Sequence, residues 1–104
     1  LVLAGEALLI VEGEERPLKQ WDFVHCPPET RHVFVGAGAG PCVLLAASSR
    51  QFQAEGPWGL YTVDEASRRH NAAPDVETQD GDVAYAHVPP AAPARYRAGL
   101  LPGG

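Results

Sequence analysis

The chain has 104 residues and a formal net charge of -5, and 45% of its residues are hydrophobic while 20% are charged. This length suits one domain, and the composition is that of a globular protein. The net charge is negative, and the eight Lys and Arg residues are scattered along the chain. Both features argue against nucleic acid as a partner, because phosphate binding needs clustered positive charge. No apolar run reaches the roughly 20 residues that a helix needs to cross a bilayer, which argues against a membrane partner.

The two cysteines, Cys26 and Cys42, lie in apolar runs and lack the spacing of a zinc knuckle. Spacing alone leaves a disulfide between them open. We interpret both as reduced thiols in a cytoplasmic protein. The chain starts without Met in what reads as a strand, Leu1–Leu3, so we expect further residues upstream.

Before Arg50, short apolar runs alternate with turn residues, a pattern typical of a compact all-β domain. The sequence 12–14 predicts a tight hairpin turn in which Gly13 adopts a positive φ. Pro17 predicts an edge strand or a bulge, because proline has no N–H to donate to a ladder. The glycine-rich segment 36–41 predicts a flexible turn. The expected strands are Leu1–Leu3, Ala7–Val11, Glu15–Lys19, Phe23–Cys26, Arg31–Val35 and Cys42–Ala47.

After Arg50 the pattern changes, and we divide the chain into residues 1–49 and an extension of residues 50–104. In the extension, Asp64 is placed to cap a short helix over Glu65–His70. A polar loop is expected to follow, then a short strand over Ala84–Val88. The last part, rich in Pro and Ala, favours an extended tail that either contacts the β domain or a second subunit or stays poorly ordered.

The most informative stretch is WDFVHCPPETRHVFVG, residues 21–36. It resembles the second conserved motif of the cupin family, which runs Gly, five residues, Pro, one residue, Gly, two residues, His, three residues, Asn. Pro27 and His32 fall in register with that motif, and Asp22 and Pro28 are common in the family at their positions. The two prolines end one strand and stiffen a turn, so His32 is the first long polar residue on the returning strand.

Three positions depart from the motif. Trp21 and Glu29 stand where the family has Gly, and Gly36 stands where it has Asn. The turn at Glu29 usually requires a positive φ, which costs a residue other than Gly some energy. We therefore expect that loop to be slightly remodelled, while the metal-ligand position is untouched.

The resemblance implies an all-β fold, a cupin-type double-stranded β-helix or jelly-roll barrel. Here the barrel would be incomplete at the N-terminus and followed by the short helix and the tail. Residues 1–7 resemble the end of the first cupin motif, with Gly5 as its closing glycine. The His-x-His pair and Glu of that motif would then lie upstream of Leu1.

The resemblance also implies a divalent metal ion, Zn, Fe, Ni or Mn, with His32 as one ligand and the others supplied upstream. A lone imidazole holds metal weakly, so we expect little binding by this chain alone. His32 could instead be a buried, hydrogen-bonded histidine without metal.

Strand alternation sorts the neighbours of His32 by face. If His32 points into the barrel, Phe34 does too, and in cupins the positions of Val24 and Cys26 also face inward. His25 then lies on the outer face, as an exposed or interface histidine rather than a ligand. Cys26 could be a soft ligand but suits a core thiol. The outer face would carry Phe23, Val33 and Val35, an apolar surface that predicts a homodimer.

Three functions fit these observations. The first is a metal-dependent cupin acting on a small molecule, although the fold does not choose the reaction and whether the chain is an enzyme stays open. The second is a cupin that binds a small ligand or serves as a sensor without metal or turnover. The third is a jelly roll of another kind, such as a carbohydrate-binding module stacking on Trp21, Trp58 and Tyr61, although such aromatics also suit a core.

Overall fold

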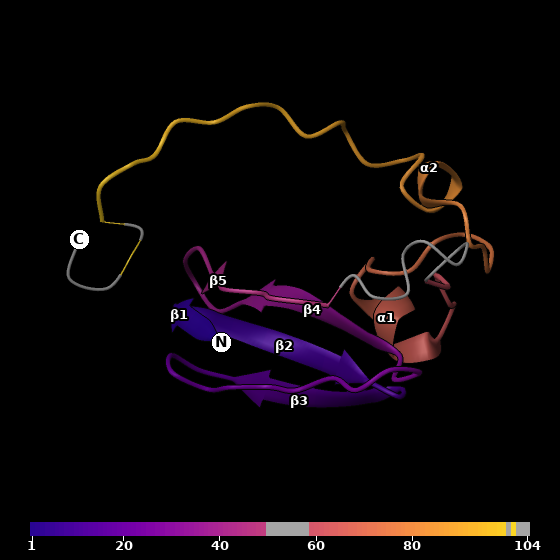
Figure 1. The fold of residues 1–104 in the computed structure, drawn as a ribbon, viewed down its shortest axis with the longest axis horizontal. Coiled ribbons are helices and arrows are strands. Elements are labelled where there is room, and N and C mark those ends of the chain that lie inside the picture. Colours follow the sequence, from indigo (N-terminus) through magenta and orange to yellow (C-terminus); the bar gives the residue numbers. More distant parts are fainter. Residues whose placement is uncertain (50–58, 100, 102–104) are drawn as a thin grey trace. The chain divides into compact units, whose positions relative to one another are not determined.

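A computed structural model describes residues 1–49, 59–99 and 101 of the chain (Figure 1). The chain divides into two compact units. The first comprises Leu1–Ala46 together with residues from Ala94 onward, and the second comprises Ala47–Pro93. Of the elements in the described residues, the five strands belong to the first unit and the two short helices to the second.

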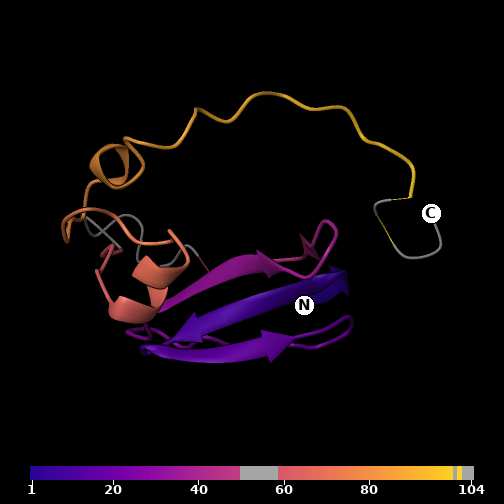
Figure 2. The same cartoon turned by 180° about the vertical axis from the view of Figure 1, so that it is seen from behind.

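The larger sheet of the first unit has three antiparallel strands in the order β3-β2-β4. These are β2 (Glu6–Val11), β3 (Glu14–Leu18) and β4 (His32–Ala37). Figures 1 and 2 show β2 between its two partners. Its apolar run without alternation suits this central place, since Ala7 and Leu9 on one face and Ile10 on the other are all buried. The sheet is therefore built around β2.

The β2–β3 connection is the predicted hairpin, and the prediction is confirmed. Val11 pairs with Glu14, so the loop is the dipeptide Glu12-Gly13, with φ of 49° and 80°. Two positive φ values are the requirement of a type I′ turn, whose twist matches the strands that it joins. The edge position predicted from Pro17 is confirmed as well, because among the described residues β3 pairs with β2 alone.

The smaller sheet pairs β1 (Val2–Ala4) with β5 (Val43–Leu44). The strand expected over Cys42–Ala47 is thus shorter than predicted. Gly5 follows β1 with a φ of 76°, and a Cβ there would overlap the carbonyl oxygen of Pro41 and lie 3.0 Å from Cα of Cys42. Gly5 therefore lets the two chain segments approach at this point.

Residues Trp21 and Asp22 lie opposite Val2 as a β-bulge. The Trp21 N–H donates to the Val2 carbonyl (2.8 Å), and the Val2 N–H donates to the Asp22 carbonyl (3.0 Å). With Trp21 at a φ of 73°, this is the pattern of a G1 bulge, whose first residue is normally Gly. The strand expected over Phe23–Cys26 is wrong: within the described residues, ladder bonds stop at the bulge, and an extended segment without a partner is no strand.

The second unit contains α1 (Glu65–Arg69) and α2 (Gly81–Ala84). The predicted cap of α1 is confirmed, because the Asp64 carboxylate accepts from the Ser67 N–H at 2.8 Å. The strand expected over Ala84–Val88 is wrong, since Asp80 caps α2 there and turns follow. Across the described parts of the chain, neither helix is long or apolar enough to span a bilayer.

Candidate functional site

His32 begins β4 and lies opposite Val11 of β2. Its side chain is exposed, and its Nδ1 lies 2.9 Å from the Thr30 carbonyl oxygen. The ring also makes an edge-to-face contact with Phe34, at a centroid distance of 6.1 Å and an interplanar angle of 73°. A hydrogen bond and a ring contact thus fix the imidazole on a paired strand.

This geometry decides which ring nitrogen is free. A carbonyl oxygen only accepts, so Nδ1 must donate to Thr30, and the neutral ring then carries its proton on Nδ1. The lone pair of Nε2 is left for another partner. Histidines that bind metals have this arrangement, with one nitrogen donating to a carbonyl or carboxylate and the other coordinating.

The register of β4 on β2 defines the face that carries His32. Directly paired residues of antiparallel strands share a face. His32 therefore lies with Val11, and Phe34 with the buried Leu9. The predicted common face of His32 and Phe34 agrees with this register. That this face lines a barrel cavity stays a prediction.

The other two residues predicted to line the cavity precede the Pro27-Pro28 turn. Val24 and Cys26 are half-buried, whereas Phe23 and His25 are exposed, Phe23 by 76%. Exposed and half-buried residues thus alternate along this segment as strand parity predicted, although the segment is not a strand. A contact of Val24 or Cys26 with His32 stays a prediction.

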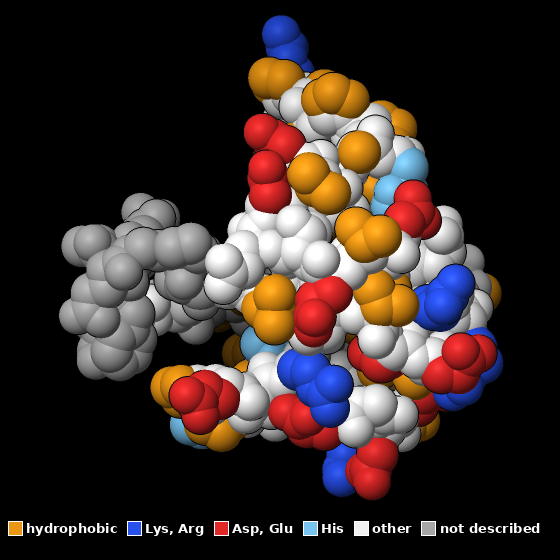
Figure 3. All heavy atoms as spheres, turned by 90° about the vertical axis from the view of Figure 1, so that its right-hand side faces the viewer, with side chains coloured by type: hydrophobic (Ala, Val, Ile, Leu, Met, Phe, Trp, Pro, Cys, Tyr) orange, Lys and Arg blue, Asp and Glu red, His pale blue; other side chains and the backbone are white. Residues whose placement is uncertain are grey.

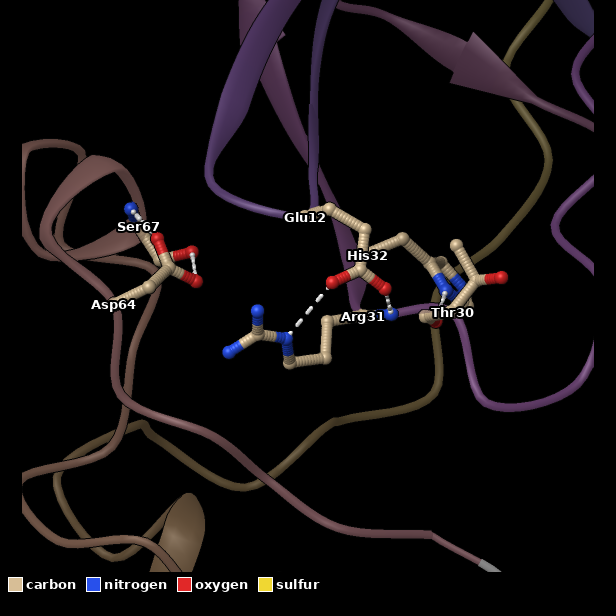
Figure 4. Close-up of polar contacts among 6 residues, drawn as sticks. All are labelled: Glu12, Thr30, Arg31, His32, Asp64 and Ser67. Carbon is tan, nitrogen blue, oxygen red and sulfur yellow. Dashed lines mark hydrogen bonds and ion pairs between the residues drawn. The ribbon is translucent and has the colours of Figure 1, made fainter.

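Glu12 and Arg31 join the β2–β3 turn to the segment that enters β4 (Figure 4). The Glu12 carboxylate accepts the Arg31 backbone N–H at 2.8 Å and the Arg31 Nε at 3.0 Å. The Glu12 N–H donates to the Arg31 carbonyl at 2.9 Å. The backbone bond from Arg31, followed by its guanidinium, holds the pKa of Glu12 below its ordinary value.

No local sequence pattern predicted this pair. The two residues are 19 positions apart; Glu12 lies outside the cupin motif, and Arg31 stands at a position that the motif leaves unspecified. One signal was present: Glu12 occupies a type I′ position where Asn, Asp or Gly is preferred. A glutamate is uncommon at such a position, where the structure gives it a φ of 49°.

A second carboxylate has the same kind of arrangement in the turn before the bulge. Asp22 accepts the Lys19 N–H and the Lys19 Nζ, both at 2.9 Å. The Lys19 backbone bond, and then its side chain, lower the pKa of Asp22. Acidic and basic side chains are likewise interspersed on the face drawn in Figure 3. Exposed pairs of this kind contribute little to stability individually.

The residues present fit a metal ion only in part. The Nε2 of His32 has the chemistry of one ligand, but the described residues contain no group of three His, Cys, Asp or Glu side chains able to hold an ion. A metal centre needs about three protein ligands. The described part of the chain therefore supplies one coordination position and not a complete centre.

Tyr61, one of the aromatic residues considered as a stacking surface, has its ring contact within the second unit. Tyr61 is half-buried and packs edge-to-face on Tyr85, with centroids 5.5 Å apart, as a core aromatic does. Trp21 is 59% exposed in the other unit, and Trp58 lies outside the described residues. Tyr61 and Tyr85 thus form a packing pair within the second unit.

Both cysteines are free thiols and half-buried. No curated protein and no solved structure shows significant similarity to the chain. A family model, described as the cupin domain, matches residues 1–48. The match covers all five strands and the whole of the motif that contains His32. Residues 1–48 of this chain therefore belong to the cupin superfamily.

Proposed function

We propose that this cupin domain binds a small molecule at a metal centre to which His32 contributes Nε2. The observation that carries the proposal is the Nδ1 hydrogen bond to Thr30, which leaves Nε2 as the available donor. The exposure of the side chain and its place on a paired strand support the same role. The metal would be a divalent ion, Zn, Fe, Ni or Mn.

The remaining ligands would come from outside these 104 residues. β4 pairs with β2 along one edge, and within the described residues no strand pairs with its other edge. A further strand added there would lie beside His32 and could bring the first-motif His-x-His pair and Glu to it. When bound, the ion would act as a Lewis acid or hold the ligand in place.

The test compares the 104-residue chain with the same chain preceded by a first cupin motif. Both proteins are dialysed against zinc, nickel and iron, and bound metal is measured. We expect stoichiometric metal only in the longer protein, and its loss in His32→Ala. His25→Ala is the matched control, because His25 is also exposed but is predicted to lie on the outer face. Metal retained in His32→Ala, or one ion held by the short chain, would overturn the proposal.

A cupin that binds a small ligand without metal is the second candidate. The apolar character of the face that carries His32 favours it, since Leu9, Val11 and Phe34 share that face. Such a wall suits an apolar ligand held by packing. Metal content and oxygen uptake of the motif-bearing protein separate the two candidates, because only the first requires an ion.

We further propose a homodimer in the cytoplasm. Exposed Phe23 supports a dimer, although Val33 and Val35 are half-buried and add less surface than predicted. The two free thiols support a reducing compartment. Titration of thiols in freshly isolated protein should give two free groups per chain, and a disulfide would contradict this assignment.

A further inference from the structure

The Glu12 carboxylate and the His32 ring bind the two ends of one peptide unit. The Thr30 carbonyl and the Arg31 N–H belong to the same peptide group, and in a trans peptide they point in opposite directions. The N–H end donates to Glu12 at 2.8 Å, and the C=O end accepts from His32 Nδ1 at 2.9 Å. A continuous chain of hydrogen bonds thus runs from the carboxylate through the peptide to the imidazole (Figure 4).

From this geometry we infer that Glu12 is a positioning residue for His32. A negative charge on the N–H end polarises the peptide and strengthens its carbonyl as an acceptor. The stronger acceptor holds the His32 proton on Nδ1 and keeps Nε2 as the free donor. Arg31 supports the carboxylate through Nε at 3.0 Å. This is the role of an outer partner of a metal-binding histidine, here transmitted through a peptide group.

The conformation of Glu12 supports a role for its side chain. Its φ of 49° is disfavoured for a residue with a long side chain, and the turn by itself would prefer Asn or Gly. Glu reaches Arg31, whereas the shorter Asn would not. The residue is therefore unfavourable for the hairpin and suited to the bond that it makes.

The inference gains its functional meaning from the proposed ligand role of His32, but the ring geometry can be measured on this chain alone. The test records the ring ¹⁵N resonances of His32 in the pH range where they no longer change with pH, so that they report the ratio of the two neutral tautomers. The variants are Glu12→Asn, which suits the left-handed turn but cannot reach Arg31, and Glu12→Gln, which keeps an acceptor without the charge. Asp22→Asn is the matched control, because Asp22 makes the same two bonds with Lys19 away from His32.

We expect His32 to be mainly protonated on Nδ1 in the unchanged protein. In Glu12→Asn the ratio of Nδ1–H to Nε2–H should fall roughly threefold to tenfold, the factor that corresponds to one hydrogen bond of ordinary net strength. Glu12→Gln should lie between, and Asp22→Asn should leave the ratio unchanged. An unchanged ratio in Glu12→Asn, or an equal change in Asp22→Asn, would overturn the inference.

A second measurement separates this inference from the proposed function. In the protein that carries a first motif, zinc affinity should fall roughly tenfold to a hundredfold in Glu12→Asn, as for other outer partners of metal ligands. If His32→Ala leaves zinc affinity unchanged while Glu12→Asn changes the ring proton, the ligand role fails and the positioning role stands. If His32→Ala abolishes binding while Glu12→Asn leaves the ring proton unchanged, the positioning role fails.

Discussion

Two side chains occupy positions where the cupin motif has glycine, and both keep a glycine-like backbone. Trp21 has a φ of 73° and Glu29 a φ of 65°. The remodelling expected at Glu29 is not seen in this angle, which is left-handed as the motif requires. The backbone conformation of the motif is thus retained at the expense of local strain, which amounts to about 1–2 kcal/mol for such a residue.

Replacing Glu29 with glycine should stabilise the protein. Glycine relieves the backbone strain at this φ but loses more conformational entropy on folding than glutamate does. Because the relieved strain is the larger of the two, Glu29→Gly should raise the free energy of unfolding by about 0.5–1 kcal/mol. Urea unfolding followed by circular dichroism measures this. Glu29→Ala is the control, because Ala suffers the same strain and should give no gain. Equal effects of Gly and Ala would show that the angle is not strained.

Gly5 and Gly13 provide a second comparison. Both have a positive φ, but only at Gly5 would a Cβ overlap backbone atoms, while Gly13 faces open space. Gly13→Ala should therefore cost about 1–2 kcal/mol through strain alone. Gly5→Ala should cost clearly more, because the Pro41 carbonyl cannot move without disturbing β1 and β5. Equal losses in urea unfolding would contradict the close approach at Gly5.

At the scale of elements, the turn that contains Asp22 makes the bulge sensitive to acid. The folded-state pKa of Asp22 is lowered, first by the Lys19 N–H and then by the Lys19 side chain. The folded protein then binds this proton more weakly than the unfolded chain. The stability that the pair contributes is present above the unfolded pKa, and it is lost as the pH falls through the lowered folded pKa.

Asp22→Asn should therefore reduce the dependence of the free energy of unfolding on pH, measured by urea unfolding from about pH 6 to about pH 3. Lys19→Met should remove the smaller part of the effect, because the backbone N–H of residue 19 remains. If Lys19→Met removed more than half of the pH dependence that Asp22→Asn removes, the assigned order of causes would be reversed.

Local signals predicted the elements that depend on neighbouring residues. Gly13 predicted the hairpin, Pro17 the edge strand and Asp64 the helix cap, because each acts within a few positions. Strand formation depends on a distant partner instead. Phe23–Cys26 has the alternation of a strand yet lacks a ladder in the described residues. The range Ala84–Val88 holds the last residue of α2, which Asp80 caps, and the turns that follow it.

The candidate site likewise contains one residue that a local motif predicted and contacts that depend on distant parts of the chain. His32 was found from the spacing of a motif, and its strand pairing and exposure are now defined. The Thr30 bond that selects its free nitrogen depends on backbone geometry, and the Glu12–Arg31 pair joins segments 19 positions apart. Neither follows from local sequence periodicity, which carries no information on which distant side chains meet.

At the scale of the whole molecule, the proposed dimer predicts a specific dependence on Phe23. Light scattering at micromolar concentration should give twice the mass of one chain, and Phe23→Asp should reduce it to one. Val76→Asp is the matched control, since Val76 is also exposed but belongs to the second unit. A monomer mass for the unchanged chain would exclude the dimer.

The most direct test of the account follows His32 while metal is added. Zinc is titrated into the ¹⁵N-labelled protein that carries a first cupin motif, and the ring nitrogens of His32 and His25 are observed. The account predicts that Nε2 of His32 shifts on binding while Nδ1 keeps its proton and its bond to Thr30. A shift at Nδ1 of His32, or at His25 with His32 unchanged, would contradict the central claim.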